Sequence, residues 1–370
     1  MATHCLRVDH ARSICGDPRC SHNRWHPDIA PALRIASGDS VEIQARDCAD
    51  GQIRPGMVNG DLADLSMDRC HTLTGPIHVE GAVPGDLLAI HVEKVVPASY
   101  GFSAILPGLG LLPEDVTGPF LVHWQCEDGY ATSPQLPGIR IKGAPFMGVM
   151  GLAPSLERLR RVNQAEARAA RNGAMVFSPL ANEAVPSLAA VAAEGWRTIA
   201  PQDTGGNIDI RQLSAGSTLY LPVDVPGALF STGDGHYAQG DGESCGTAIE
   251  IAATLTARFE LLKGAARDRG QTAPSYLAPH LHAQDEIQGY FATTGRSVAG
   301  DGAVHVNDAT LAARNATREM IRILAKDYDL TPEQAYCAIS VAGDLRLSVM
   351  VNPPYALASL AIPRSIFARG

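Results

Sequence analysis

The sequence predicts an α+β fold that is dominated by antiparallel β-sheet, with a β-sandwich-like core and a helical pair near the C-terminus. Three observations lead to this prediction. Apolar and polar residues alternate over several stretches, Gly (36) and Pro (25) are abundant, and the signals that begin helices are concentrated late in the chain. Alternation with a period of two is typical of antiparallel strands that bury one face, and Gly and Pro mark the turns between them.

The clearest strand lies within residues 247–262. Every second residue from Ile249 onward is apolar there, and Glu250 belongs to the opposite, polar face. Residues 40–46 and 88–93 alternate in the same way. Turn sequences separate these runs: Ser37-Gly38-Asp39, Pro84-Gly85-Asp86 and Pro226-Gly227.

Two helices are predicted near the C-terminus. Asp308 is placed to cap a helix over about 309–327. Thr331-Pro332-Glu333-Gln334 combines an N-cap, a proline at the first helical position and a capping-box glutamine, and the helix that follows should run to about Val341. A weaker helical pattern covers 156–171. Its polarity indicates an exposed helix or an insertion.

The chain is expected to form a single domain over residues 1–370, because no repeat or low-complexity linker divides it. Within this domain two β-rich halves can be distinguished, at about 1–145 and 200–370. The segment at about 150–200 is then an insertion between them.

Composition and charge exclude several functions. The formal net charge is −9 and the sequence has no basic tract, so it lacks the electrostatic footprint of a protein that binds nucleic acid or an anionic membrane. No apolar stretch approaches the ~20 residues of a membrane span, and the first residues do not resemble a signal peptide. Eight cysteines are scattered along the chain, a pattern typical of reduced thiols. We therefore expect a cytoplasmic protein.

The densest group of reactive side chains lies in residues 233–243. Asp234 and His236 are two residues apart, and so are Asp241 and Glu243, so an extended backbone would place each pair on one face. Carboxylates with an imidazole suit zinc, manganese or iron. A polar turn between two strands is an equally good interpretation of the composition alone.

Three further groups have weaker patterns. Asn207 and Asp209 follow a Gly-Gly turn and would share a face, although a capped turn fits this pattern better. Asp61, His71 or Glu80 are able to complete a metal site, and a solvated strand face is the alternative. The last of the three groups crowds potential zinc ligands into twelve residues, unlike the spacing of structural zinc sites. Its members are Cys15, Cys20, His22 and His26. Within it, His26 is the better candidate for a pocket residue.

The sequence Gly242-Glu243-Ser244-Cys245-Gly246 matches the G-x-S-x-G nucleophile elbow. That motif requires a helix after the turn, whereas the alternation that follows here predicts a strand. Cys245 remains a candidate thiol nucleophile, but a buried structural cysteine is more common.

At these positions the sequence resembles the acetamidase/formamidase family. The matching stretches run in order along nearly the whole chain: 22–29, 74–81 with 84–86, 205–209, 219–223 with 226–230, 233–250 and 340–346. The resemblance implies a β-rich fold with α+β additions, homo-oligomers, and release of ammonia from a short amide with a bound divalent metal. It departs at Thr204, where acetamidases carry a histidine, and this puts any role for that histidine in doubt here.

From this resemblance we derive a mechanistic hypothesis. A divalent metal, with zinc expected first, is held by Asp234, His236 and Asp209, with Asp61 as a further ligand, and lowers the pKa of a water toward ~7. Glu243 accepts the proton as the water attacks the amide, and then passes it to the leaving nitrogen.

In the same hypothesis Asn207 or a glycine N–H stabilises the oxyanion, and His26, His71 and Glu80 contact the substrate. Two alternatives stay open. One is an amidase with Cys245 as nucleophile and a structural metal; the other is a non-catalytic protein that binds metal or amide.

Overall fold

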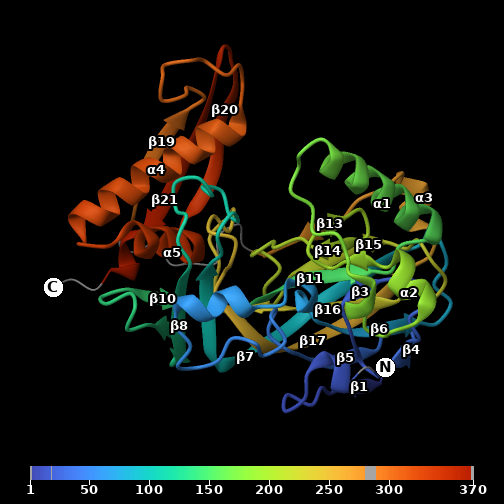
Figure 1. Cartoon of the computed structure of the whole chain (residues 1–370). Helices are drawn as coiled ribbons and strands as arrows, with labels where there is room; N and C mark the ends of the chain where they lie inside the picture. Colours follow the sequence, from blue (N-terminus) through green and yellow to red (C-terminus); the bar gives the residue numbers. More distant parts are fainter. Residues whose placement is uncertain (1, 18, 280–288, 368–370) are drawn as a thin grey trace.

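The computed structural model describes residues 2–17, 19–279 and 289–367. It confirms an α+β fold dominated by antiparallel sheet (Figure 1). One sheet of 16 strands contains the path β10-β9-β8-β7-β17-β16-β11-β14-β13. The bounds along this path are β10 Arg140–Lys142, β9 Tyr130–Thr132, β8 Phe120–Glu127, β7 Leu87–Ile105, β17 Glu250–Leu262, β16 Phe230–His236, β11 Phe146–Leu152, β14 Gly205–Asn207 and β13 Pro201–Gln202.

Further strands branch from this path. They are β1 Thr3–Leu6, β2 Ser21–His22, β4 Leu33–Ile35, β5 Ser40–Ala45, β6 Leu73–Val79, β15 Thr218–Pro222 and β18 Ser275–Leu277. The pairs β1–β5 and β4–β6 are parallel. A separate pair joins β3 (Arg24–Trp25) to β12 (Trp196–Arg197). Strands from before residue 145 and from after residue 200 therefore share one sheet.

The alternation within residues 247–262 is confirmed as β17. Its apolar side chains Leu255, Ala257 and Phe259 are fully buried, and together with apolar residues of β5, β6, β7, β11, β15 and β16 they form one core cluster. Burial of such side chains stabilises a fold by about 1.5–3 kcal/mol each. This core supports the loops and strand ends that carry the polar groups described below.

The C-terminal region is a smaller layer of helices and strands. α4 (Ala309–Asp327) packs on a three-stranded sheet of β19 (Tyr290–Arg296), β21 (Tyr355–Pro363) and β20 (Asp344–Asn352), and α5 (Pro332–Ala342) follows (Figure 1). Both predicted caps are present. The Asp308 carboxylate accepts from the Leu311 N–H at 2.9 Å, and Thr331 and Gln334 exchange both capping-box hydrogen bonds.

The segment between the two β-rich parts carries α1 (Leu156–Arg171) and α2 (Ala189–Glu194), and a short α3 spans Ala265–Arg269. α1 confirms the weak helical pattern there, and only Leu159 of this helix is buried. Among the described residues, every helix is too short or too polar to cross a membrane.

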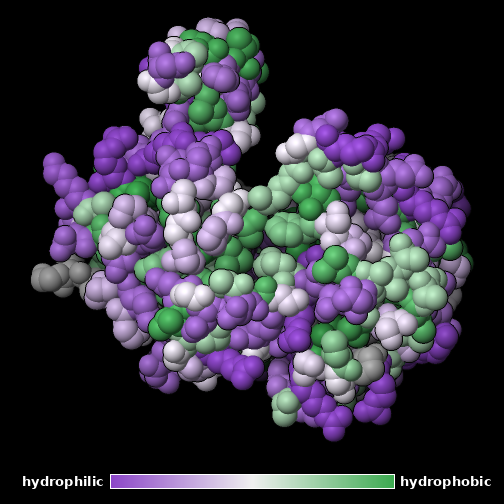
Figure 2. Space-filling model, viewed as in Figure 1, coloured by the Kyte–Doolittle hydropathy of each residue, from purple (hydrophilic) through white to green (hydrophobic). Residues whose placement is uncertain are grey.

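The far end of the three-stranded sheet protrudes from the molecule. Figure 2 shows this part as a knob that carries hydrophobic residues. Exposed apolar side chains in this region are Val304, Val306, Leu347 and Val351. They lie in β20 and in the chain between β19 and α4.

Candidate active site

A buried cluster of carboxylates and one imidazole lies where β16, β17, β14 and one glycine-rich turn meet. Asp234 and His236 lie on β16 and Glu250 begins β17, and all three are at most 2% exposed. His236 Nε2 lies 3.1 Å from Glu250 Oε2 and 3.4 Å from Asp234 Oδ1. Candidate ligand atoms of Asp209, Asp234 and His236 lie within 4.8 Å of one another, as do those of His236, Glu243 and Glu250.

Strand register explains why these side chains converge. β16 and β17 are antiparallel, and His236 stands directly opposite Glu250. Directly opposed residues of antiparallel strands carry side chains on the same face. Asp234 adopts a positive φ of 57° between two glycines, a conformation that is uncommon outside Gly, Asn and Asp.

Close approach to β11 requires a glycine. Gly148 lies on β11, and a Cβ atom there would stand 2.5 Å from Asp209 Oδ1, 2.6 Å from Asp234 Oδ2 and 2.8 Å from His236 Cε1. These contacts are too short for any side chain. Gly148 therefore provides the space in which the three polar groups pack together.

A glutamine orients the imidazole. His236 Nδ1 donates to Gln239 Oε1 at 2.8 Å, and Gln239 Nε2 donates to the backbone carbonyl of Asp209 at 2.9 Å. A hydrogen bond of this kind at one ring nitrogen fixes the tautomer, so that the lone pair of the other nitrogen faces the cluster.

The electrostatics of the cluster favour a cation. Burial raises the pKa of Asp209 to about 8, and the charge of Asp234 adds to this. Burial also raises the pKa of Glu243 well above its ordinary value, with a further contribution from Asp209. Burial lowers the pKa of His236, but the Glu250 and Asp234 carboxylates outweigh this and raise it. The cluster thus contains four carboxyl groups and a single imidazole, which cannot balance the charge of four carboxylates.

The donor set fits a divalent metal. Within the described residues, several buried atoms of the cluster make no hydrogen bond of good geometry, although His236 Nε2 lies close to both carboxylates: Asp209 Oδ1, Asp234 Oδ1, His236 Nε2 and Glu250 Oε2. Leaving such atoms without a partner is costly. Carboxylate oxygens with one imidazole nitrogen are a donor set that zinc and manganese accept.

The cluster forms one wall of a cavity of about 130 Å³. Asp234, Glu243 and Glu250 line it together with His71 and Asn207, and most of the remaining lining side chains are apolar. Asn207 Nδ2 donates to the Ile199 carbonyl at 2.9 Å. His71 Nε2 lies 4.0 Å from Asp234 Oδ2.

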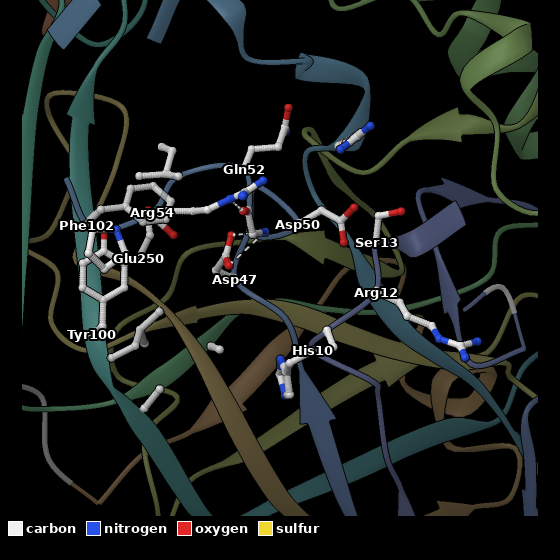
Figure 3. Close-up of a pocket in the computed structure, with 18 of the residues that line it drawn as sticks. His10, Arg12, Ser13, Asp47, Asp50, Gln52, Arg54, Tyr100, Phe102 and Glu250 are labelled. Atoms are coloured by element: carbon white, nitrogen blue, oxygen red, sulfur yellow. Dashed lines mark hydrogen bonds between the residues drawn. The ribbon is translucent and has the colours of Figure 1, made fainter. Parts of the chain in front are cut away.

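A second cavity, of about 560 Å³, is larger (Figure 3). Tyr100, Phe102 and Glu250 lie on one side of it, and Ser13 and Asp50 on the other. Glu250 is the member of the buried cluster that both cavities share. We place the chemistry in the smaller cavity, because Asp234, Glu243 and Glu250 of the cluster line it, whereas Glu250 alone of the cluster lines the larger one.

The structure thus brings together most residues that the sequence indicated: Asp209, Asp234, His236, Glu243, Asn207 and His71. It corrects the placement of Asp61, which lies on a short 3-10 helix (Asn59–Asp64) and accepts from the Val58 N–H at 2.8 Å. This carboxylate caps its own helix and is absent from the walls of the cavity.

Two other predicted positions are corrected. His26 is buried elsewhere, and its Nδ1 accepts from the Asp28 N–H at 3.1 Å. Glu80 follows β6 at the surface, with its side chain 57% exposed and 3.7 Å from Arg34. Neither lines the cavity. His26 and Glu80 therefore do not reach a substrate held at the cluster.

Sequence reasoning missed three members of the site. Glu250 was assigned to the polar face of its strand, but this face is covered here and the carboxylate points into the cluster. Cys48 has its thiol near Asp234 and Glu250. Gln239 lies within the 233–243 segment, where only the charged residues and His236 had been considered. The position of Glu250 opposite the Asp-x-His pair was the available signal.

The remaining cysteine hypotheses find little support. Cys245 is fully buried, and Ser340 Oγ accepts a hydrogen bond from its backbone N–H. It does not line the cavity, and the strand β17 follows it. Cys15 is exposed, and Cys20 Sγ donates to the Arg7 carbonyl. A zinc site of Cys15, Cys20, His22 and His26, which their spacing disfavoured, is not found among the described residues.

The sequence of this chain is similar to those of known proteins. A family model described as the acetamidase/formamidase family matches residues 7–369. The chain is 33% identical to the acetamidase of Mycolicibacterium smegmatis, over 90% of this chain and 88% of the relative. It is 33% identical to the formamidase of Methylophilus methylotrophus, over 94% of this chain and 89% of the relative.

Among solved structures, a gamma lactamase from Delftia acidovorans superposes with a TM-score of 0.93 at 30% identity. The match covers 99% of this chain and 94% of that one.

Proposed function

Because this chain belongs to the acetamidase/formamidase family, we propose that it hydrolyses the C–N bond of a small amide, releasing a carboxylate and ammonia, and that it does so with a divalent metal. The resemblance seen in the sequence motifs is confirmed by the family match. The observation that carries the metal part of the proposal is the set of buried oxygen and nitrogen atoms without hydrogen-bond partners around His236.

Asp209, Asp234, His236 and Glu250 are the residues that would hold the metal. When bound, a divalent ion such as zinc acidifies a water and polarises the amide carbonyl. Amides need such help, because their carbonyl is a poor electrophile and an amide anion is a poor leaving group. Gln239 orients His236, and Gly148 lets the three polar side chains approach one another.

Glu243 is placed to move the proton. It lines the cavity beside the cluster, and burial raises its pKa, which makes its carboxylate a stronger base than that of an ordinary glutamate for taking a proton from the water and returning it to the leaving nitrogen. Asn207 carries a second amide N–H beyond the one given to Ile199, and this donor is available to an oxyanion. His71 lines the same cavity and would position the substrate.

The test compares ammonia release by the unmodified protein and by Glu243→Gln, with formamide, acetamide, propionamide and an aryl amide. Glu80→Gln serves as the matched control, since Glu80 is an exposed carboxylate outside the cavity. We expect Glu243→Gln to lose at least about a hundredfold in kcat while it keeps its bound metal. Full turnover by this variant, with the metal retained, would remove Glu243 from the proton-transfer role.

A second candidate reaction is the opening of a cyclic amide. The observation that favours it is the TM-score of 0.93 with the gamma lactamase. Incubation with a γ-lactam and detection of the amino acid product tests it. Product formed faster than ammonia from any linear amide would make lactam opening the main reaction.

Two further proposals concern the protein as a whole. All eight cysteines are free, which supports function in the reducing cytoplasm. The exposed apolar side chains of the knob support assembly into a homo-oligomer, because apolar side chains gathered on one part of a surface often mark an interface.

A further inference from the structure

The cavity beside the acidic cluster has two chemically different walls. Its polar lining includes Asp234, Glu243 and Glu250 of the cluster with His71 and Asn207, whereas most of its other lining side chains are apolar. The apolar wall includes Leu65, Met67, Phe102, Leu106, Leu109 and Phe177. Such a division indicates a ligand with one polar end and one apolar end.

The apolar wall packs in part against the buried interior. Phe102 is 3% exposed and belongs to a core cluster, against which Leu65, Met67 and Leu106 pack. Packing against this core holds the partly buried side chains of the wall in place. Phe177 comes from the chain between α1 and α2, the segment predicted as an insertion, and lines the same cavity.

The size of the cavity exceeds the smallest amides. A volume of about 130 Å³ holds on the order of ten waters, at about 10–15 Å³ for each. Formamide and acetamide would fill only part of it. A metal held by the carboxylates would occupy the polar wall and leave the apolar wall to the substrate.

Charge narrows the class of substrate further. The ionisable side chains that line this cavity, within the described part of the chain, are carboxylates, thiols and His71. No lysine or arginine is available there to pair with an anionic acyl group. An acyl chain that carried its own carboxylate would be repelled by Asp234, Glu243 and Glu250.

On these grounds, and resting on the amidase function proposed above, we propose that the substrate is an uncharged amide whose acyl group is apolar and longer than acetyl, and that Phe177 helps to set this preference. Alkyl chains of several carbons and aryl groups both meet this description. Each buried methylene should raise kcat/KM about fourfold.

The test is a series of linear amides from acetamide to hexanamide, with benzamide and the monoamide of succinic acid added. Ammonia release gives kcat/KM for each with the metal-loaded protein. We expect kcat/KM to rise along the alkyl series, by on the order of a hundredfold to hexanamide, and to be lowest for the anionic amide. Values that stay flat or fall with chain length would overturn the inference while leaving the amidase function intact. Absence of ammonia from every amide would instead reject the proposed function.

Phe177→Ala tests the specific role of that side chain. The control is Phe291→Ala, because Phe291 is a 44% exposed phenylalanine on β19 and lies outside this cavity. Phe177→Ala should lower the ratio of kcat/KM for hexanamide over that for acetamide about tenfold, and Phe291→Ala should leave this ratio unchanged. An unchanged ratio in both variants would exclude Phe177 from acyl recognition.

Discussion

Asp209→Asn should stabilise the metal-free protein and weaken its response to metal. Asp209 Oδ1 is buried beside Asp234 and makes no hydrogen bond within the described residues. Burial and the charge of Asp234 raise its pKa from 3.8 to about 8. The folded state therefore holds a proton that the unfolded state releases at neutral pH, and this difference opposes folding. Asparagine has nearly the same shape and carries no charge.

The expected magnitude follows from the pKa shift. Between the ordinary pKa of 3.8 and about pH 7 lie roughly three pH units, which correspond to about 4 kcal/mol of lost stability. Because folding raises the pKa of Asp209, the free energy of unfolding falls as the pH rises from the pKa in the unfolded chain, about 4, to the pKa in the folded protein, about 8. Asp209→Asn should gain up to this amount near pH 7, and well under 1 kcal/mol near pH 4.

Urea unfolding of stripped protein at these two pH values measures the effect. Zinc should then reduce this difference near pH 7. A metal at 100 times its Kd adds about 2.7 kcal/mol to the protein that binds it, and the variant has lost one ligand. Glu80→Gln, which changes an exposed carboxylate, should show neither effect. Equal stability of Asp209→Asn and the unmodified protein, with and without zinc, would refute the electrostatic account of the cluster.

Three other substitutions test separate parts of the account. Gly148→Ala should weaken zinc binding at least about tenfold in a zinc titration, with little change in circular dichroism, because the added Cβ would stand 2.5 Å from Asp209 Oδ1. Unchanged zinc affinity would mean that the cluster does not need this space. Gln239→Leu should lower zinc affinity about 10–100-fold by releasing His236 Nδ1, and a variant that binds zinc normally would show that the imidazole is oriented by other groups. Cys245→Ser should release ammonia within about threefold of the unmodified rate, because the thiol is buried outside the cavity, whereas a loss beyond a hundredfold would revive the thiol nucleophile.

The fold was predictable where its signals are local. Alternation within residues 247–262 predicted β17, and Asp308 and Thr331 marked the starts of α4 and α5, because strand faces and helix caps are set by neighbours in the sequence. The pairing order of the 16-stranded sheet was not predictable in this way. It depends on contacts between distant segments, such as β7 with β17.

The prediction of the candidate site succeeded for residues that lie close together in the sequence. It failed where contacts between distant segments decide which side chains meet. Asp234, His236 and Glu243 lie within ten residues, so composition alone drew attention to them. Glu250 was missed because period-two alternation distinguishes two faces but does not reveal that both are covered. Asp61 and Glu80 were placed in the site because their residue types fit, whereas only the long-range path of the chain shows that they point elsewhere.

The most direct test of the central claim is a titration of zinc into stripped protein, with bound metal and ammonia release measured on the same samples. The account predicts that stripped protein is inactive and that the rate rises in proportion to the zinc bound, with neither binding nor activity in His236→Ala. Full ammonia release from protein that holds no metal would contradict it.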